Sequence, residues 1–237
     1  MGMRLFCIFL IAILSLGTLS AGEIDGLVVV THRLTKKKVT LSAAEYQRGV
    51  AVPLGANAES QDALSYERSH VVVYLEDDRP SGARTAKMEQ KDRRFVPDLL
   101  VIPRGSTVSF PNLDPIFHNV FSLSRSKSFD LGNYPRGQAR VVTFSNAGIV
   151  LVDCHLHTNM AAVILVTPGP CATRAEGDGR FTLRGVPPGN HTLVAWHKAA
   201  GFFHQTIEVT TAHSVKAEFV IPLKADAISG RQAMLEK

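Results

Sequence analysis

One stretch decides the fold: Val150-Leu-Val-Asp-Cys-His-Leu-His-Thr-Asn-Met-Ala-Ala-Val-Ile-Leu-Val166. It places three side chains that can bind a metal, Cys154, His157 and Met160, between two apolar and β-branched runs. Runs of this kind are typical of strands in a β-sandwich. Three residues of an extended strand advance about 10 Å, so the three donors can converge only where a strand ends. The stretch therefore predicts two strands joined by a loop that begins at Cys154.

The donor types in this loop indicate which ion it suits. A thiolate, an imidazole and a thioether are soft ligands, and with a second imidazole they make a trigonal His₂Cys site with a long axial Met, which binds copper for electron transfer. His118 lies 36 residues before Cys154 and opens an apolar strand. We expect His118 to supply the second imidazole.

A distant His followed by Cys-x-x-His-x-x-Met resembles the cupredoxins, with the short ligand loop of amicyanin and the His-Asn pair of plastocyanin. The resemblance implies that His118, Cys154 and His157 are the equatorial ligands of one type 1 copper ion and that Met160 is the axial ligand. It also implies that Asn119 ties the His118 strand to the Cys154 loop, and such outer partners hold ligands in place.

The likeness extends beyond the ligands, over roughly residues 69 to 167. Residues 88–110 resemble the cupredoxin segment in which a strand, a Pro-x-Gly turn and another strand lead into Asn112-Leu-Asp114. The segment Ser128-Phe-Asp-Leu-Gly132 fits the same pattern, which is similar to that of bacterial secreted proteins labelled methylamine-utilisation-like. His155 departs from it, because such relatives carry Asn there. Neighbouring residues of a strand point to opposite faces, so we expect His155 to lie on the surface or behind the ligands.

Composition and the chain start indicate an exported globular protein. The chain has 237 residues, enough for one large or two small domains. Residues 1–22 contain Arg4, then an apolar run and then small residues. This pattern predicts a signal peptide that is cleaved. We therefore expect a periplasmic or secreted protein without a membrane span. Without Arg4 the chain keeps 25 basic and 21 acidic side chains. This balance is mild, so we expect no nucleic-acid partner.

Residues 23–68 and 168–237 flank the expected cupredoxin domain at 69–167. The first segment should hold a strand at 26–33 and an irregular insertion with a short helix near 41–48. We expect another strand at 69–76, inside the cupredoxin domain.

Residues 168–223 resemble the carboxypeptidase-regulatory-like, or transthyretin-like, β module, and 224–237 read as a polar tail. Gly-Asp-Gly and Pro-Pro-Gly turns separate alternating strands in this module, and 205–210 and 215–221 should form its last hairpin. The module is short and could share the strand at 26–33. Its predicted core consists of Phe181, Leu183, Leu193, Val194 and Trp196.

The remaining histidines and cysteines allow other interpretations. His191, His197 and His204 share the C-terminal module, but no ligand-spaced pair accompanies them, so we expect structural roles. After loss of Cys7 with the signal, Cys154 and Cys171 remain, and disulfides persist in oxidising compartments.

We therefore predict an all-β chain: a Greek-key cupredoxin β-sandwich followed by a small transthyretin-like β-sandwich. Its expected function is to carry one electron to a transient redox protein partner, as a monomer. Two alternatives stay open, a copper-holding or delivery protein of the cell envelope and a metal-free interaction module with a Cys154–Cys171 disulfide. The sequence has no nucleophile motif, paired acids or phosphate loop, so an enzyme is not expected.

Overall fold

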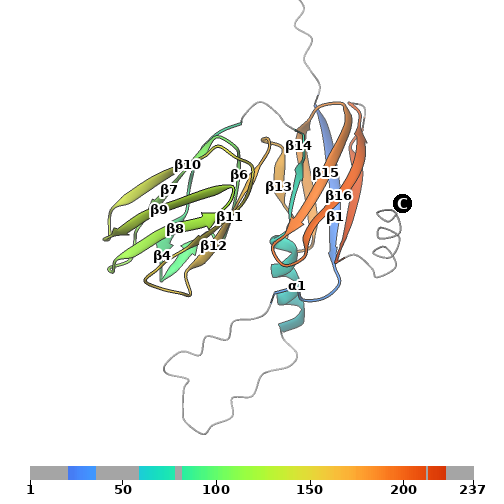
Figure 1. Cartoon of the computed structure of the whole chain (residues 1–237). Helices are drawn as coiled ribbons and strands as arrows, with labels where there is room; N and C mark the ends of the chain where they lie inside the picture. The colour runs from blue at the N-terminus through green and yellow to red at the C-terminus, as the bar shows by residue number, and fades with distance from the viewer. Residues whose placement is uncertain (1–20, 36–58, 78–81, 212, 223–237) are drawn as a thin grey trace, which may run out of the picture.

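The computed structural model describes four parts of the chain, residues 21–35, 59–77, 82–211 and 213–222 (Figure 1). Most of these residues lie in strands, and α1 (Glu59–Ser69) is the one helix in the described part. The predicted all-β class is confirmed. No helix among the described residues is long and apolar enough to cross a membrane.

Residues 1–20 of the expected signal, the short helix near 41–48 and the tail at 224–237 lie outside the described residues. The helix α1 falls at the end of the segment that we expected to be irregular.

The first sandwich packs a five-stranded sheet, in the order β6-β12-β11-β8-β9, against a three-stranded sheet, in the order β10-β7-β3. A small hairpin, β4–β5, lies beside β7. The bounds of its strands are β3 Thr85–Lys87, β4 Glu89–Lys91, β5 Arg94–Val96, β6 Leu99–Pro103, β7 Ser106–Pro111, β8 His118–Ser124, β9 Lys127–Tyr134, β10 Ala139–Phe144, β11 Gly148–Asp153 and β12 Ala161–Thr167.

The core of this sandwich follows the two-residue period of its strands. Val150 and Val152 of β11 and Ile164 of β12 point inward, toward Val108 and Phe110 of the opposite sheet. Alternate residues of a strand face opposite sides of a sheet, which explains why these positions are two apart. The two strands predicted on either side of the Cys154 loop are confirmed.

The second sandwich also has two sheets, in the orders β14-β1-β17 and β13-β2-β15-β16. Its core contains residues from both sheets, including Ile24, Phe181 and Leu193. The bounds of its strands are β1 Gly22–Val30, β2 Val72–Leu75, β13 Ala172–Arg174, β14 Arg180–Val186, β15 Gly189–His197, β16 Gly201–Val209 and β17 Val215–Ile221.

Two expected strand pairings differ from those observed. We expected residues 69–76 in the first sandwich, but β2 pairs with β13 and β15 of the second. We also expected β16 and β17 to form a hairpin, whereas β16 pairs with β15 and β17 pairs in parallel with β1. The strand β1 therefore lies between β14 and β17. This agrees with the expectation that the second module shares the strand at 26–33.

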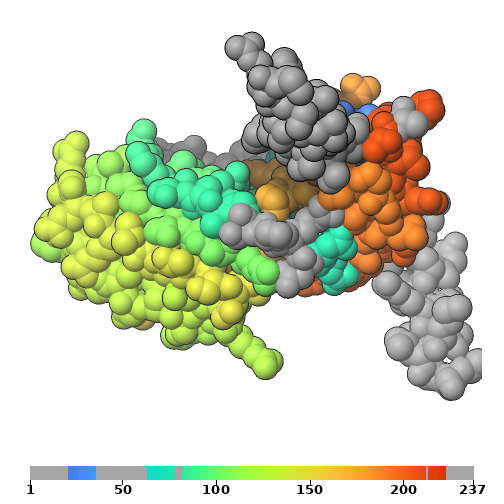
Figure 2. Space-filling view, turned by 90° about the horizontal axis from the view of Figure 1, so that it is seen from above, coloured from blue at the N-terminus to red at the C-terminus, as the bar shows by residue number. Residues whose placement is uncertain are grey.

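The two sandwiches, visible as two lobes in Figure 2, are joined by an apolar layer. Leu165 of β12 and Leu99 of β6 lie on the outer face of the five-stranded sheet and pack against Tyr74 of β2 and Trp196 of β15. Strands covered on both faces need apolar residues at every position, which explains the unbroken apolar runs of β2, β12 and the end of β15. Val194 and Trp196, predicted for the core of the second module, belong to this layer.

Candidate metal centre

The four predicted ligand positions come from two neighbouring parts of the first sandwich. His118 is the first residue of β8, and Cys154 follows directly after β11. His157 and Met160 lie in the loop between β11 and β12, as the spacing predicted. Strands β11 and β8 are neighbours in one sheet, which brings the loop beside His118.

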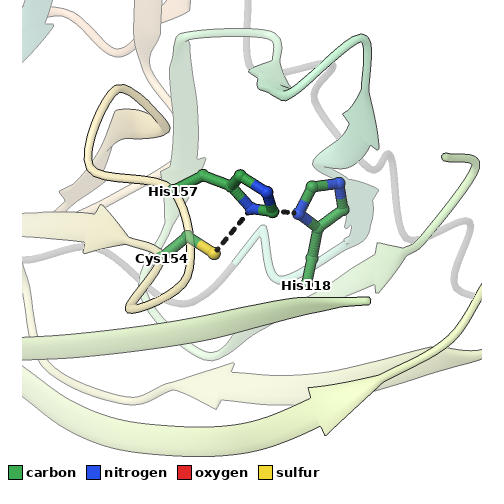
Figure 3. A group of neighbouring side chains, drawn as sticks. All are labelled: His118, Cys154 and His157. Atoms are coloured by element: carbon green, nitrogen blue, oxygen red, sulfur yellow. Dashed lines mark hydrogen bonds between the residues drawn. The ribbon is translucent and has the colours of Figure 1, made fainter. Parts of the chain in front are cut away.

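Figure 3 shows the side chains of His118, Cys154 and His157 pointing toward one another. His118 Nδ1 lies 3.1 Å from His157 Nδ1, and Cys154 Sγ lies 3.9 Å from His157 Nδ1. One donor atom from each residue lies within 4.8 Å of the other two. With bonds of about 2.0 Å to nitrogen and 2.3 Å to sulfur, the first two separations correspond to angles of about 100° and 130° at a shared ion. This donor set fits one metal ion once the third pair, His118 Nδ1 and Cys154 Sγ, closes from within 4.8 Å to the roughly 4 Å that such bonds allow.

Met160 lies in the same loop, three residues after His157. Its side chain is buried, in the same core as Cys154, and its backbone N–H donates to His157 O at 2.9 Å. Axial ligation by Met160 stays a prediction.

The contacts of Asn119 link the two parts of the site. Its backbone N–H donates to Cys154 Sγ at 3.4 Å, and its Oδ1 accepts from the N–H of His155 at 3.4 Å. Its Nδ2 donates to Asp130 Oδ1 at 2.7 Å. These bonds connect strand β8 to the Cys154 loop in the manner that the resemblance implied.

His155 points away from the donor group. Its ring stacks on Phe121 with centroids 3.7 Å apart, and its Nε2 lies 3.7 Å from Asp130 Oδ2. More than half of its side chain is exposed. Its position agrees with the surface role that we expected.

Two carboxyl groups and one imidazole near the site have shifted pKa values. Burial tends to raise the pKa of Asp114, but the N–H groups of Arg93 and Asp92 and the His118 ring outweigh it, so this pKa lies below its usual value. The Gly132 N–H and then the Asn119 side chain lower the pKa of Asp130.

The pKa of His157 is lowered by burial first and then by its electrostatic interaction with the neighbouring His118 and Arg93. The imidazole is therefore neutral at pH 7, which is the protonation state that a metal ligand requires.

The other histidines and the second cysteine lie elsewhere. His191 contacts Asp77, His197 contacts Glu67 and His204 contacts Glu76. Within the described ranges, His118, Cys154 and His157 form the one group of three or more His, Cys, Asp or Glu that could hold a metal.

Cys154 and Cys171 do not form a disulfide in this structure. The Sγ of Cys171 donates to Gly185 O at 3.7 Å. The disulfide on which the metal-free alternative depends is therefore not formed.

One contributor to the site was missed from sequence. Asp114 Oδ2 accepts a 2.7 Å hydrogen bond from His118 Nε2. The four-residue spacing between Asp114 and His118 was visible in the sequence, but four residues of irregular chain can adopt many paths. Only the fold shows that the two side chains meet.

Comparisons with known proteins give similarity in fold alone. No family model and no curated protein matches the chain. Among solved structures, a Cu-containing nitrite reductase from Thermus scotoductus is 23% identical over 38% of this chain and 25% of its own, with a TM-score of 0.34. A purple cupredoxin from Nitrosopumilus maritimus is 22% identical over 35% of this chain and 99% of its own, with a TM-score of 0.32.

Amicyanin from Paracoccus versutus is 20% identical over 40% of this chain and 96% of its own, with a TM-score of 0.33. This chain thus spans a quarter of the nitrite reductase and nearly all of the two smaller proteins.

Proposed function

We propose that this protein binds one copper ion as a type 1 centre and carries single electrons outside the cytoplasm. The observation that carries the proposal is the convergence of Cys154 Sγ with the Nδ1 atoms of His118 and His157. A bound copper ion would supply a one-electron change of oxidation state. A soft trigonal donor set with a weak axial thioether suits both of its oxidation states.

The protein's own contribution is to hold the donors still. His118 is fully buried and Cys154 nearly so, and the bonds of Asn119 connect the strand of one to the loop of the other. Close packing restricts the movement of buried side chains. The donors would therefore keep one arrangement while the charge at the centre changes.

Electrons would enter and leave near His157, which is less buried than the other two donors. Apolar side chains on neighbouring segments are partly exposed: Phe117 is 56% and Leu156 47% exposed. Small contact surfaces of this kind give weak and transient docking. We propose a redox protein as the partner, with the carrier itself a monomer.

The burial of the donors also bears on the copper-delivery alternative. Delivery requires the ion to pass to another protein, and this is easier from exposed donors. His118 has no exposed surface and Cys154 is 4% exposed, which favours retention of the ion. We therefore place electron carriage ahead of delivery.

We also propose that the second sandwich is a carboxypeptidase-regulatory-like module. Its support is the sequence pattern together with the seven-stranded sandwich that β1, β2 and β13–β17 form. Its role would be to support the first sandwich through the shared apolar layer.

The test is to add Cu(II) to the purified exported protein and to record visible and electron paramagnetic resonance spectra. An intense thiolate-to-copper band with narrow copper hyperfine splitting is expected. Cys154→Ser should abolish the band, whereas the matched control Cys171→Ser should keep it, because Cys171 lies away from the donor group. A wild-type protein that takes up no copper, or keeps its band in Cys154→Ser, would contradict the proposal.

A further inference from the structure

The side chain of Asp114 is held at both of its oxygens. It lies between β7 and β8 and is 9% exposed. Its Oδ1 accepts from the backbone N–H of Asp92 at 2.7 Å, and its Oδ2 accepts from that of Arg93 at 2.9 Å. The same Oδ2 accepts from His118 Nε2 at 2.7 Å. The carboxylate thus joins a distant turn to a proposed ligand.

That turn has an unusual backbone. Asp92 and Arg93, at the tip of the β4–β5 hairpin, both have φ of 54°. Two successive residues at positive φ are the pattern of a type I′ turn. Residues other than glycine rarely adopt positive φ. The conformation turns two consecutive N–H groups toward Asp114, where they bind its carboxylate.

The hydrogen bond to Asp114 decides which nitrogen of His118 faces the donor group. A carboxylate can only accept, so His118 Nε2 carries the proton. In a neutral imidazole the other nitrogen, Nδ1, then holds a lone pair. This is the atom that lies 3.1 Å from His157 Nδ1. His118 is therefore held in the tautomer that metal ligation through Nδ1 requires.

We infer that Asp114 is a positioning residue for the metal centre, fixing the tautomer and ring orientation of His118 and tuning the potential of the bound ion. The inference rests on the proposed function. A carboxylate that accepts a hydrogen bond from a ligating imidazole makes that ligand more basic. A more basic ligand stabilises Cu(II) relative to Cu(I), so Asp114 should lower the reduction potential.

The test compares two variants that each remove one carboxylate charge near the site. Asp114→Asn replaces the group that contacts His118. Asp92→Asn is the matched control, because the Asp92 side chain is exposed, its contribution to Asp114 comes from the backbone N–H, and Asn tolerates positive φ. The reduction potential of the copper-loaded proteins is measured by a redox titration. Asp114→Asn should raise it, and by clearly more than Asp92→Asn does.

A second measurement needs neither copper nor a variant. The ¹⁵N chemical shifts of His118 in the metal-free wild-type protein, recorded at alkaline pH, should show the proton of the ring on Nε2. In Asp114→Asn this preference should weaken, while Asp92→Asn should keep it.

The two kinds of failure can be told apart. If wild-type protein takes up copper, but the two variants shift the potential equally or His118 is an Nδ1–H tautomer, the inference about Asp114 is wrong and the proposed function stands. If wild-type protein takes up no copper, the proposed function fails, and the inference that rests on it fails as well. A loss of stability in Asp114→Asn cannot be mistaken for the expected result, because the tautomer of His118 is measured in the wild-type protein.

Discussion

The backbone N–H of Asn119 donates a hydrogen bond to the Sγ of Cys154, 3.4 Å away. The residue after one proposed ligand is thus bonded to another proposed ligand that directly follows a different strand. The side chain of Asn119 strengthens the same link through His155 N and Asp130 Oδ1. The site therefore depends on contacts between strands as well as on the local spacing of its donors.

Asn119→Ala should weaken copper binding by about 10- to 100-fold, the cost that outer-shell changes commonly have. The backbone bond to Cys154 remains in this variant, but the side-chain bonds to the loop and to Asp130 are lost. Competition with a chelator of known affinity measures the effect. Asn133, the exposed partner of Asn119 on β9, gives a matched control, and Asn133→Ala should bind copper as wild type does. Equal affinity in both variants would contradict the proposed link.

Met160→Gln should keep the copper and lower its reduction potential. The axial ligand of a type 1 site tunes its potential, and an amide oxygen is harder than a thioether and favours Cu(II). Redox titration of the loaded variant measures the change. Met88→Leu serves as control, since Met88 is buried in the same core but lies outside the predicted ligands. An unchanged potential in Met160→Gln would show that Met160 is no ligand.

Glu67→Ala should destabilise the protein by about 1–3 kcal/mol, because the hydrogen bonds to its carboxylate are lost and their buried donors are left without an acceptor. Glu67 Oε1 accepts from the N–H groups of Leu34 and Thr35, and its Oε2 lies 3.1 Å from His197 Nε2. Denaturant unfolding gives the free-energy change. The exposed residue Glu208 provides the control, because Glu208→Ala should cost no more than about 0.5 kcal/mol. Similar losses in the two variants would argue against a structural role for the buried Glu67 carboxylate.

Protonation of Asp98 should make the folded protein less stable at low pH than at neutral pH. A hydrogen bond from His70, the largest cause, lowers the pKa of Asp98 to about 2. A lowered carboxyl pKa gives stability above the unfolded-state pKa of about 4 that is lost as pH falls toward 2. The side chain is half exposed, so this stability is at most about 1 kcal/mol. Asp98→Asn should therefore lose less stability than wild type between about pH 5 and pH 2, measured by denaturant unfolding at each pH.

Arg93→Gly should stabilise the β4–β5 hairpin by up to about 1 kcal/mol, because glycine adopts positive φ without the steric cost that other residues meet. The N–H that binds Asp114 remains in this variant. Arg94→Gly is the matched control: Arg94 lies in β5, where glycine should destabilise by about 0.5–1 kcal/mol. Thermal unfolding distinguishes them, and changes of the same sign would be evidence against strain at Arg93.

The local part of the candidate metal centre was predictable from sequence. Cys154, His157 and Met160 lie within seven residues, and the apolar runs beside them fix where the strands end. The link from His118 to Asp114 and on to the turn at Asp92 was not predictable. It joins segments that are 22 residues apart. It also depends on a backbone with positive φ at Asp92 and Arg93, which these residue types do not indicate in a sequence.

The assignment of strands to sandwiches was also beyond the sequence. The run Val72–Leu75 is apolar on both faces, which indicates a strand covered on both sides. The pattern does not say which sheet it joins, because a strand's partners are set by contacts far away in the chain. The predicted core of the second module was wrong at Val194 and Trp196 for the same reason, since both face the other sandwich.

The position of β1 sets an order in which the two sandwiches can be completed during synthesis. Every strand from β3 to β12 has been synthesised once residue 167 is made, so the sandwich with the proposed copper site can close early. β1 is made first, yet its neighbours β14 and β17 end at residues 186 and 221. Among the described strands, the earliest must therefore wait for the last one, and the sandwich without the candidate metal centre finishes folding second.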